Sequence, residues 1–401
     1  MKVRLFYLYK FLQDFVPIYP VYLLLFESKG ISVAEISLLL AIWSVPVVLL
    51  EVPAGLLADY WSRKNMMLIA VFLKATGYTA WFISDGFFLF AIGFVFWGAS
   101  EAFRSGSEEA YLYDTLKEKG EEASFDKILG KSYFYSTVGV TIATLMGGFM
   151  AMFLGMKVTL VLSILSMILC SFIVLRFKEV NYFLLNNQHK AESKLKRSIG
   201  TLKEATKFCV AEREIFIMGL LAICIVGTAD LIDEYDQLIA SRYGLSMGFI
   251  GVWMAIRYFL SSIGGAGAYK LKLFLEKNWI KERFHTVLVL SLMAAVFLGV
   301  SGYVGKIVIM PLYGLFYLVM AAAHVLQEDY IQQKVKEEGR STIHSLVSLG
   351  RNLYGIIFFS LFAILLSYVD IYGMLMVVAI YIIVGCGVLN LAFHLYKKKS
   401  V

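Results

Sequence analysis

Seven ionisable side chains lie within stretches of the sequence that are otherwise apolar. If such a stretch crosses a membrane, a charge at its centre costs roughly 2.5–3.5 kcal/mol on insertion scales, so each one needs a chemical reason. A carboxylate in a medium of low dielectric can hold a proton at physiological pH, and a cation can bind an anion or neutralise a carboxylate. The seven residues are Asp14, Lys74, Glu101, Arg104, Asp230, Arg257 and Arg351.

Helical spacing brings some of these groups together. Glu101 and Arg104 are three residues apart, so they share one face of a helix and can form an ion pair. A second group has the spacing i, i+3, i+4 and i+7, which predicts an acidic stripe along one side of a helix. Its members are Asp230, Asp233, Glu234 and Gln237.

Two interpretations of these charges stay open. In the first, opposite charges neutralise each other and hold the helices together, which suits the pair that is three residues apart. In the second, Asp14 and Asp230 carry protons, because their carboxylates lie in apolar surroundings. An acidic cavity would also attract a cationic substrate, although Arg257 and Arg351 could hold an anionic one.

The composition assigns these charges to a membrane protein. Of the 401 residues, 59% are hydrophobic and 17% are charged, and the mean hydropathy is +0.73. Soluble domains are nearer to half apolar and one quarter charged. A single core could not bury the surplus, since cores stop growing at roughly 250–300 residues. We therefore expect the lipid bilayer to be the solvent of this chain.

Other classes of protein fit the sequence less well. The net charge is +7, but the basic residues lie in short loops without a continuous basic face, so no nucleic-acid partner is predicted. The four cysteines are far apart and form no CxxC motif, which predicts neither disulfides nor a zinc site. HExxH does not occur, and the five histidines are scattered. We therefore predict no catalytic residue, no metal and no cofactor, and we do not expect an enzyme.

Apolar windows of about 20 residues, the length that crosses a hydrocarbon core, recur along the chain. Six precede a polar stretch at residues 178–213 and six follow it, which predicts an N-terminal bundle (1–177), a cytoplasmic linker and a C-terminal bundle (214–401). The windows are 5–26, 33–57, 66–84, 87–107, 128–150, 157–177, 214–239, 248–270, 284–303, 307–327, 342–366 and 372–396.

Prolines and glycines within the windows predict local features of the helices. Gly264-Gly265-Ala-Gly267 is attributed to close helix packing and not to a phosphate loop, because it lies inside an apolar span with no strand before it. Kinks are expected at Pro17, Pro20, Pro46, Pro53 and Pro311.

The distribution of lysine and arginine predicts the orientation. With the N-terminus inside, about 29 of the 37 basic residues fall in cytoplasmic segments, about four outside and about four within spans. This bias predicts a multi-pass protein of the cytoplasmic membrane with both termini in the cytoplasm.

One loop carries a recognisable motif. Between the second and third windows stands Gly55-Leu-Leu-Ala-Asp59-Tyr-Trp-Ser62-Arg63-Lys64, which resembles the G-x-x-x-D-x-x-x-[RK]-[RK] signature of the major facilitator superfamily. Members commonly carry glycine where Ser62 stands. The corresponding loop of the second half, 270–283, is basic but lacks the aspartate. Residues 98–114 also resemble a fourth-helix pattern of bacterial members that are drug and metabolite exporters.

The resemblance implies an all-α integral membrane fold of twelve helices, in two six-helix bundles related by pseudo-two-fold symmetry. Helices 1, 4, 7 and 10 then line a central cavity, and helices 2, 5, 8 and 11 form the seam. The expected substrate or proton-coupling residues on these helices are Asp14, Glu101, Arg104, Asp230, Glu234, Arg257 and Arg351.

The motif itself is expected to form a gate. A glycine at position 55 allows helices to approach closely, and Asp59 can face the positive end of another helix, which the resemblance identifies as helix 11. Arg63 and Lys64 would pair with acids at the foot of helix 4 and break these pairs as the halves rock. Alternatively, these cations only obey the positive-inside rule. The acids concerned are Glu108, Glu109 and Asp114.

Two further ionisable residues are expected to have no part in transport. Helix 3 is peripheral in the resembled fold, so Lys74 is expected to extend its amine to the interface. His324 lies near the cytoplasmic end of helix 10 and is interpreted as an interfacial residue, with a proton relay as the alternative.

The sequence therefore predicts a secondary transporter that works by alternating access on a small-molecule substrate. The favoured activity is export of drug-like or amphipathic compounds in exchange for protons, as a multidrug-resistance antiporter. The alternative is proton-coupled uptake of a metabolite or siderophore. A monomer is expected to suffice.

Overall fold

The chain has an all-α fold. The computed structural model describes residues 3–105, 107–180, 212–278, 282–334 and 340–400, and these ranges contain helices, turns and coil but no strand. Within them, eleven helices are long and apolar enough to cross a membrane. The predicted linker lies largely outside the described residues.

The chain divides into two compact units, which we describe separately. Unit 1 comprises residues 1–195 together with 246–254, and unit 2 comprises residues 196–245 and 255–401. The helices that lie wholly in unit 1 are α1 (Val3–Asp14), α2 (Tyr22–Ser28), α3 (Val33–Tyr60), α4 (Arg63–Ile83), α5 (Phe87–Ser105), α6 (Glu108–Lys117), η1 (Glu122–Ser124), α7 (Phe125–Leu154) and α8 (Met156–Leu175).

The second half of the chain begins with a segmented helix. The elements are α11 (Arg213–Leu220), η2 (Leu221–Val226), α12 (Thr228–Asp233), α13 (Asp236–Arg242), α14 (Met247–Asn278), α15 (Arg283–Val304), η3 (Ile307–Ile309), α16 (Met310–Lys334), α17 (Arg340–Leu365) and α18 (Ile371–Ser400). The first part of α14 is grouped with unit 1. Inside unit 2, α15 packs against both α16 and α18.

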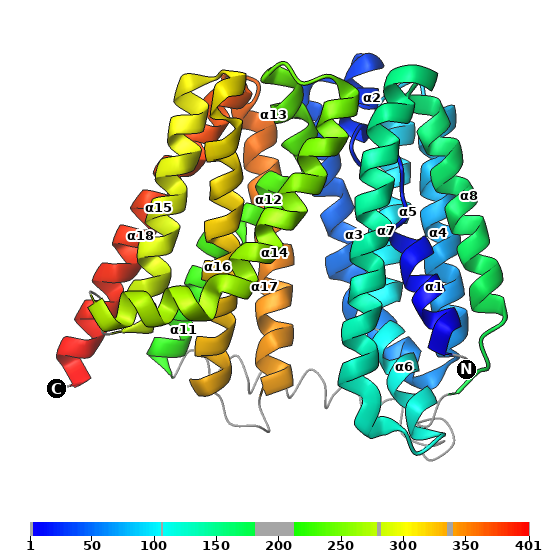
Figure 1. Ribbon diagram of the computed structural model, residues 1–401, viewed down its shortest axis with the longest axis horizontal. Coiled ribbons are helices and arrows are strands. Elements are labelled where there is room, and N and C mark those ends of the chain that lie inside the picture. Colours follow the sequence, from blue (N-terminus) through cyan, green and yellow to red (C-terminus); the bar gives the residue numbers. More distant parts are fainter. Residues whose placement is uncertain (1–2, 106, 181–211, 279–281, 335–339, 401) are drawn as a thin grey trace. The chain divides into compact units, whose positions relative to one another are not determined.

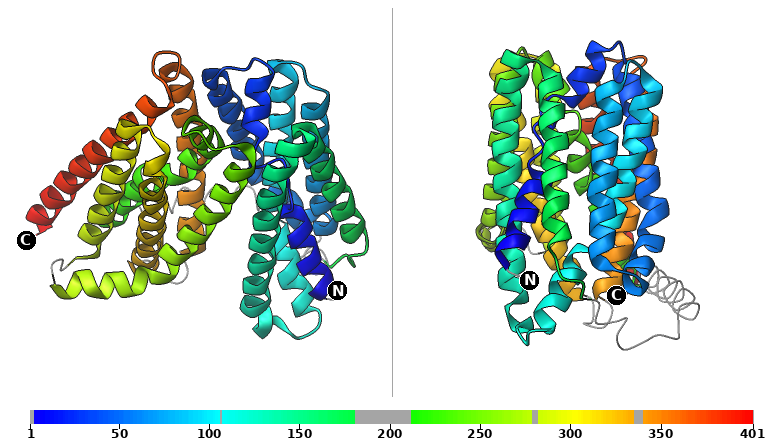
Figure 2. Two further views of the ribbon diagram at one scale, coloured as in Figure 1. Left: turned by 45° about the horizontal axis from the view of Figure 1, so that its top comes forward. Right: turned by 90° about the vertical axis from the view of Figure 1, so that its right-hand side faces the viewer.

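The first predicted span is not one continuous helix. The chain leaves the helical conformation after α1 and resumes it in α2, with Pro17 and Pro20 in the connecting coil (Figure 1, dark blue). Proline removes a backbone donor and clashes with the preceding turn, which explains the break. Neither α1 nor α2 is long enough to be one of the eleven long helices. The interrupted span and these eleven helices together correspond to the twelve predicted windows. In unit 1, α1 lies beside α7 and α8 (Figure 2, right).

The other prolines lie either inside a helix or at the start of one. Pro46 and Pro53 lie inside α3, which continues through both of them. Pro311 is the second residue of α16, in the first turn, where a backbone N–H needs no helical partner. The predicted kink at Pro311 is therefore wrong, because this proline begins a helix and does not interrupt one.

The seventh predicted span, 214–239, is also interrupted. The wide π-type turn of η2 follows α11, and α12 ends at Asp233, three residues before α13 begins. Each irregularity changes the direction of the side chains that follow it. Asp236, which is outside the predicted acidic stripe, thereby becomes a fully buried residue.

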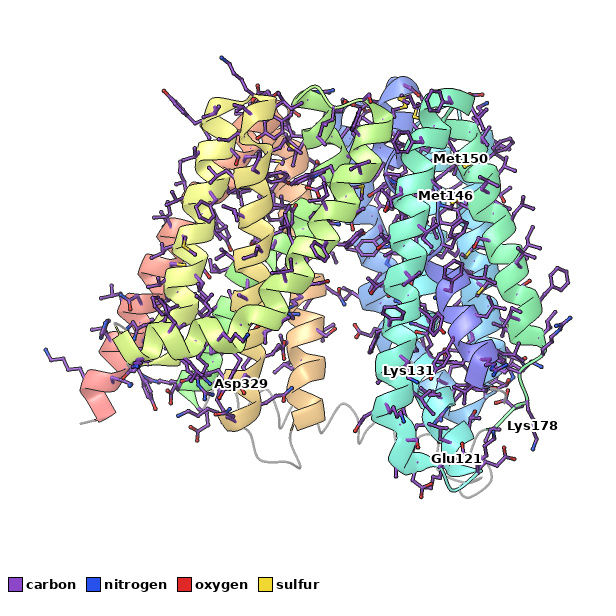
Figure 3. All side chains as sticks on the ribbon, viewed as in Figure 1. Glu121, Lys131, Met146, Met150, Lys178 and Asp329 are labelled. Carbon is purple, nitrogen blue, oxygen red and sulfur yellow. The ribbon has the colours of Figure 1, made fainter. Side chains whose placement is uncertain are left out.

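The outward surfaces of both units are apolar. Large side chains such as Phe72, Phe153 and Phe259 are 69%, 74% and 66% exposed. Along α7, Lys131 lies towards one end of the helix, while Met146 and Met150 lie further along it (Figure 3). Apolar helix walls with charges near the ends suit a hydrocarbon solvent. The chain is therefore a multi-pass membrane protein.

Glycine allows α14 and α16 to approach closely. A Cβ atom built on Gly264 would lie 2.0 Å from the carbonyl oxygen of Leu318, whereas one on Gly267 would contact nothing within 4 Å. We expect Gly264→Ala to lower the free energy of unfolding by about 1–3 kcal/mol, because the two backbones must separate. Unfolding in mixed SDS micelles measures this change.

The matched control is Gly267→Ala in the same helix. Alanine there should leave the free energy of unfolding unchanged or raise it by up to about 1 kcal/mol, the difference in helix propensity. Equal effects of the two substitutions would contradict the close approach at Gly264.

Candidate functional site

Unit 1 contains a buried network of charges centred on Glu108. The Oε2 atom of Glu108 lies 3.1 Å from Lys10 Nζ and 3.2 Å from Arg104 Nη1. Glu108 and Lys10 are only 5% and 4% exposed. Arg104 also pairs with Glu101 on α5, the partner predicted from their spacing. Two cations and two carboxylates thus neutralise each other inside the helix bundle.

A polar side chain of α1 completes this network. With its amide oriented to match its neighbours, Gln13 can donate to the hydroxyl of Tyr9 and, at 3.1 Å, to Glu108 Oε1, and its oxygen can accept from Arg104 Nε at 3.2 Å. Gln13 is 2% exposed. Because a buried ion pair is costly unless its remaining hydrogen bonds are satisfied, these contacts favour a well-ordered network.

A second group of unit 1 surrounds Asp14 at the end of α1. Its carboxylate accepts a hydrogen bond from Ser136 Oγ of α7. Lys74 of α4 interacts electrostatically with Asp14, and its Nζ lies 3.3 Å from the backbone oxygen of Gln13 and 5.6 Å from the ring centre of Tyr19. Lys74 is 5% exposed. The expectation that this amine extends to the interface is therefore wrong.

The residues of the predicted gate are partly brought together. Arg63 Nη1 lies 2.5 Å from Asp114 Oδ2 and donates to the carbonyl oxygen of Ala110 at 2.6 Å. Lys64 Nζ instead donates to the carbonyl oxygen of Leu175 at 2.9 Å. Of the three acids expected at the foot of helix 4, only Asp114 contacts one of these two cations in the described part of the chain.

Other members of the motif differ from the expectation. A Cβ atom built on Gly55 would contact no described atom within 4 Å, and the close helix approach expected at this glycine stays a prediction. Glu108 belongs to the buried network, and Glu109 accepts from the hydroxyl of Tyr133 at 2.6 Å. The side chain of Asp59 is outside the described residues.

Unit 2 contains a cavity of about 460 Å³ with charged side chains in its wall. It is formed by residues of α12, α14, α16 and α17 together with the end of η2. Its ionisable lining residues are Asp230, Asp233, Arg257, His324 and Arg351. A cavity of this size with a few polar groups in an apolar wall is typical of a small-molecule site.

Both arginines of this cavity have acidic partners. Arg257 Nη1 pairs with Asp233 and Arg257 Nε lies 2.8 Å from Asp236 Oδ2, while Arg257 itself is 4% exposed. Arg351 Nη2 lies 3.3 Å from Glu328 Oε1 and 3.3 Å from the Gln327 oxygen.

Asp230 differs from these paired residues. Its carboxylate lines the cavity and is accessible to solvent, and it forms no hydrogen bond or ion pair with the described residues. His324 lines the same cavity, and the two side chains interact electrostatically. The interpretation of His324 as an interfacial residue is therefore incomplete, because the imidazole is part of the cavity wall.

Several residues of the two sites were not singled out from the sequence. Lys10 lies in a basic N-terminal segment, where a lysine is not unusual. Asp236 falls outside the helical spacing that groups Asp230, Asp233, Glu234 and Gln237. For Asp236 the break in the seventh span was the available signal, since side chains after a break leave the regular period of the helix. The spacing gave no signal for Lys10, which lies in α1 before the break at Pro17 and Pro20. No group of three metal-ligating side chains occurs among the described residues.

Comparison with known proteins gives consistent matches. The model of the Major Facilitator Superfamily matches residues 6–359. The uncharacterized MFS-type transporter YxaM of Bacillus subtilis (strain 168) is 20% identical over 372 residues, which cover 91% of this chain and 89% of that protein.

Solved structures are similar to this chain in fold. The nucleoside transporter NupG aligns with a TM-score of 0.73 and 14% identity, over 98% of this chain and 99% of NupG. A D-xylose-proton symporter aligns with a TM-score of 0.71 and 13% identity, over 97% of this chain and 96% of the symporter.

Proposed function

The chain belongs to the major facilitator superfamily, and we propose that it exchanges small amphipathic organic cations for protons across the cytoplasmic membrane. Membership of this family makes it a transporter and not an enzyme. The proposal concerns the substrate, the coupling ion and the direction of transport.

One observation carries the proposal. In the cavity of unit 2, Arg257 and Arg351 both have carboxylate partners, while Asp230 has none among the described residues. Occupied guanidinium groups are poor sites for an anionic substrate, and an unpaired carboxylate attracts a cation. The cavity therefore favours a positively charged ligand over a negatively charged one.

A single free carboxylate also supports exchange. Asp230 can hold either a proton or an organic cation, because protonation removes the charge that attracts the cation. Binding on one side of the membrane then displaces a proton, and protonation on the other side releases the cation. An inward proton gradient would drive the cation outwards. Apolar lining residues such as Val226, Tyr317 and Met320 suit the apolar part of an amphipathic molecule.

The remaining expectations are part of the proposal. Both termini lie in the cytoplasm, and one chain suffices for transport. The contact between Arg63 and Asp114 acts as a latch that stabilises one conformation and opens during the cycle.

Ethidium, a permanent monovalent cation, provides a direct test. In everted vesicles that contain the protein, we expect an acidic interior to drive accumulation of ethidium, and nigericin, which collapses the pH gradient, to abolish it. Vesicles from cells without the protein are the control. Accumulation that persists after the gradient collapses would refute proton exchange, and no protein-dependent accumulation would refute the cation as substrate.

A second candidate is proton-coupled uptake of a metabolite or siderophore. It is supported by the similarity in fold to a D-xylose-proton symporter. In right-side-out vesicles, D-xylose or uridine should then enter together with protons and acidify the interior. Exchange with ethidium moves protons in the direction opposite to the solute, so the sign of the pH change distinguishes the two candidates.

A further inference from the structure

Asp236 is a buried acid that lies behind the wall of the unit 2 cavity. It is fully buried, and its Oδ1 atom accepts hydrogen bonds from the hydroxyls of Tyr313 at 2.5 Å and Tyr317 at 2.8 Å. Both tyrosines belong to α16, whereas Asp236 begins α13. Two hydroxyl donors fix the position of one carboxylate oxygen and leave the other oxygen facing Arg257.

Arg257 is held between two carboxylates. Its Nε lies 2.8 Å from Asp236 Oδ2, and its Nη1 pairs with Asp233, which lines the cavity. The guanidinium carbon also lies 4.4 Å from the ring centre of Tyr258 and 5.1 Å from that of Tyr317. These contacts bind the guanidinium group to Asp233 and Asp236, whereas Asp230 forms no ion pair with it.

One nitrogen of Arg257 is still without a partner. Both Nε and Nη2 are buried without a hydrogen-bond acceptor among the described residues, and of these two only Nε has an ion-pair partner, Asp236. A buried donor without an acceptor is costly, so this group would pair with any further carboxylate that it could reach. If Asp236 no longer held Nε, Asp230 would be a candidate partner in the same cavity wall.

The net charge around the cavity depends on Asp236. Four carboxylates, those of Asp230, Asp233, Asp236 and Glu328, face two guanidinium groups, those of Arg257 and Arg351. The surplus is negative. Without the charge of Asp236, one half of this excess negative charge is lost, and Arg257 is held by Asp233 alone.

We infer that Asp236 is a positioning residue that sets the charge selectivity of the cavity. By holding Arg257 against Asp233, it leaves Asp230 as the unpaired anion, so that the cavity accepts monovalent organic cations and rejects anions of the same shape. The inference rests on the proposed function, since it explains why that site would prefer cations.

Tetraphenylphosphonium and tetraphenylborate test this inference, because they have nearly the same shape and opposite charge. Equilibrium binding of each ion to the protein in nanodiscs, with empty nanodiscs subtracted, gives a ratio of affinities for cation over anion. We expect Asp236→Asn to lower this ratio by about tenfold, as one unit charge near the site is removed. The double variant Asp236→Asn with Arg257→Gln should return the ratio to near the wild-type value.

Two further variants separate selectivity from folding. Asp329→Asn makes the same chemical change on α16 outside the cavity lining, and it should leave the ratio unchanged (Figure 3). Arg257→Gln alone should raise the ratio, so a failure of Asp236→Asn to fold would still leave a test with the opposite sign. A misfolded protein loses affinity for both ions, whereas the inferred change lowers the affinity for the cation and does not lower the affinity for the anion.

The outcomes distinguish this inference from the function on which it rests. If the wild-type protein binds neither ion, or binds both equally, the cationic substrate class is refuted and the inference falls with it. If the wild-type protein prefers the cation and Asp236→Asn leaves the ratio unchanged, Asp236 is already neutral or does not act through Arg257. In that case the inference is overturned while the proposed exchange stands.

Discussion

Replacing Asp230 with asparagine lowers the initial rate of ethidium–proton exchange at least about a hundredfold, the lower end of what a positioned proton-transfer group contributes. Asparagine keeps the size of the side chain but neither binds a proton in this pH range nor carries the charge that attracts a cation. Because Asp230 has no hydrogen bond or ion pair with the described residues, the substitution breaks no contact there. We expect the thermal midpoint of the purified protein to stay the same or to rise.

Quenching of ethidium fluorescence in everted vesicles measures the rate, and the amount of protein in each preparation is matched. Asp329→Asn is the control, because it makes the same substitution at a carboxylate that is not part of the cavity lining. Asp329 Oδ2 lies 2.9 Å from Arg283 Nη1. Its rate should be within about twofold of the wild-type rate, as expected for a change away from the site. A full rate for Asp230→Asn would exclude this carboxylate from coupling and from substrate binding.

Replacing Glu108 with glutamine has a large effect of a different kind. The substitution removes the carboxylate that Lys10 and Arg104 share and leaves two buried cations with less compensation. Breaking a buried ion pair from one side costs about 3–5 kcal/mol. We expect the free energy of unfolding in mixed SDS micelles to fall by about this amount.

The neighbouring residue supplies the control for this prediction. Glu109 is exposed and accepts one hydrogen bond, from Tyr133. Glu109→Gln should change the free energy of unfolding by no more than about 0.5 kcal/mol, as is usual for surface substitutions. If Glu108→Gln were equally mild, the buried network would be too hydrated to behave as the contacts indicate.

These two predictions assign different tasks to the two charged regions. In unit 1 the buried charges are paired, so their removal affects stability first. In unit 2 one carboxylate is unpaired, so its removal affects transport first. Structural pairing therefore describes Glu101 and Arg104, while proton exchange at Asp230 is what the proposed function assigns to the second interpretation.

Several properties follow from the sequence alone. The number and length of the apolar windows predict a multi-pass membrane protein, because a hydrocarbon core demands about 20 apolar residues per helix. The motif at Gly55–Lys64 identifies the family. The contact between Glu101 and Arg104 is predictable too, because residues three apart on a helix are always neighbours.

Only the tertiary structure decided which charges meet across helices. Lys10 and Glu108 are 98 positions apart, and Arg257 reaches Asp236 from a different helix. Such contacts depend on how each helix is rotated about its axis. In the seventh span the rotation of the part that holds Asp236 also depends on the break between α12 and α13. Regular spacing predicts neighbours only within an unbroken helix, so a pattern of 3.6 residues per turn could place neither Asp236 beside Arg257 nor Lys10 beside Glu108.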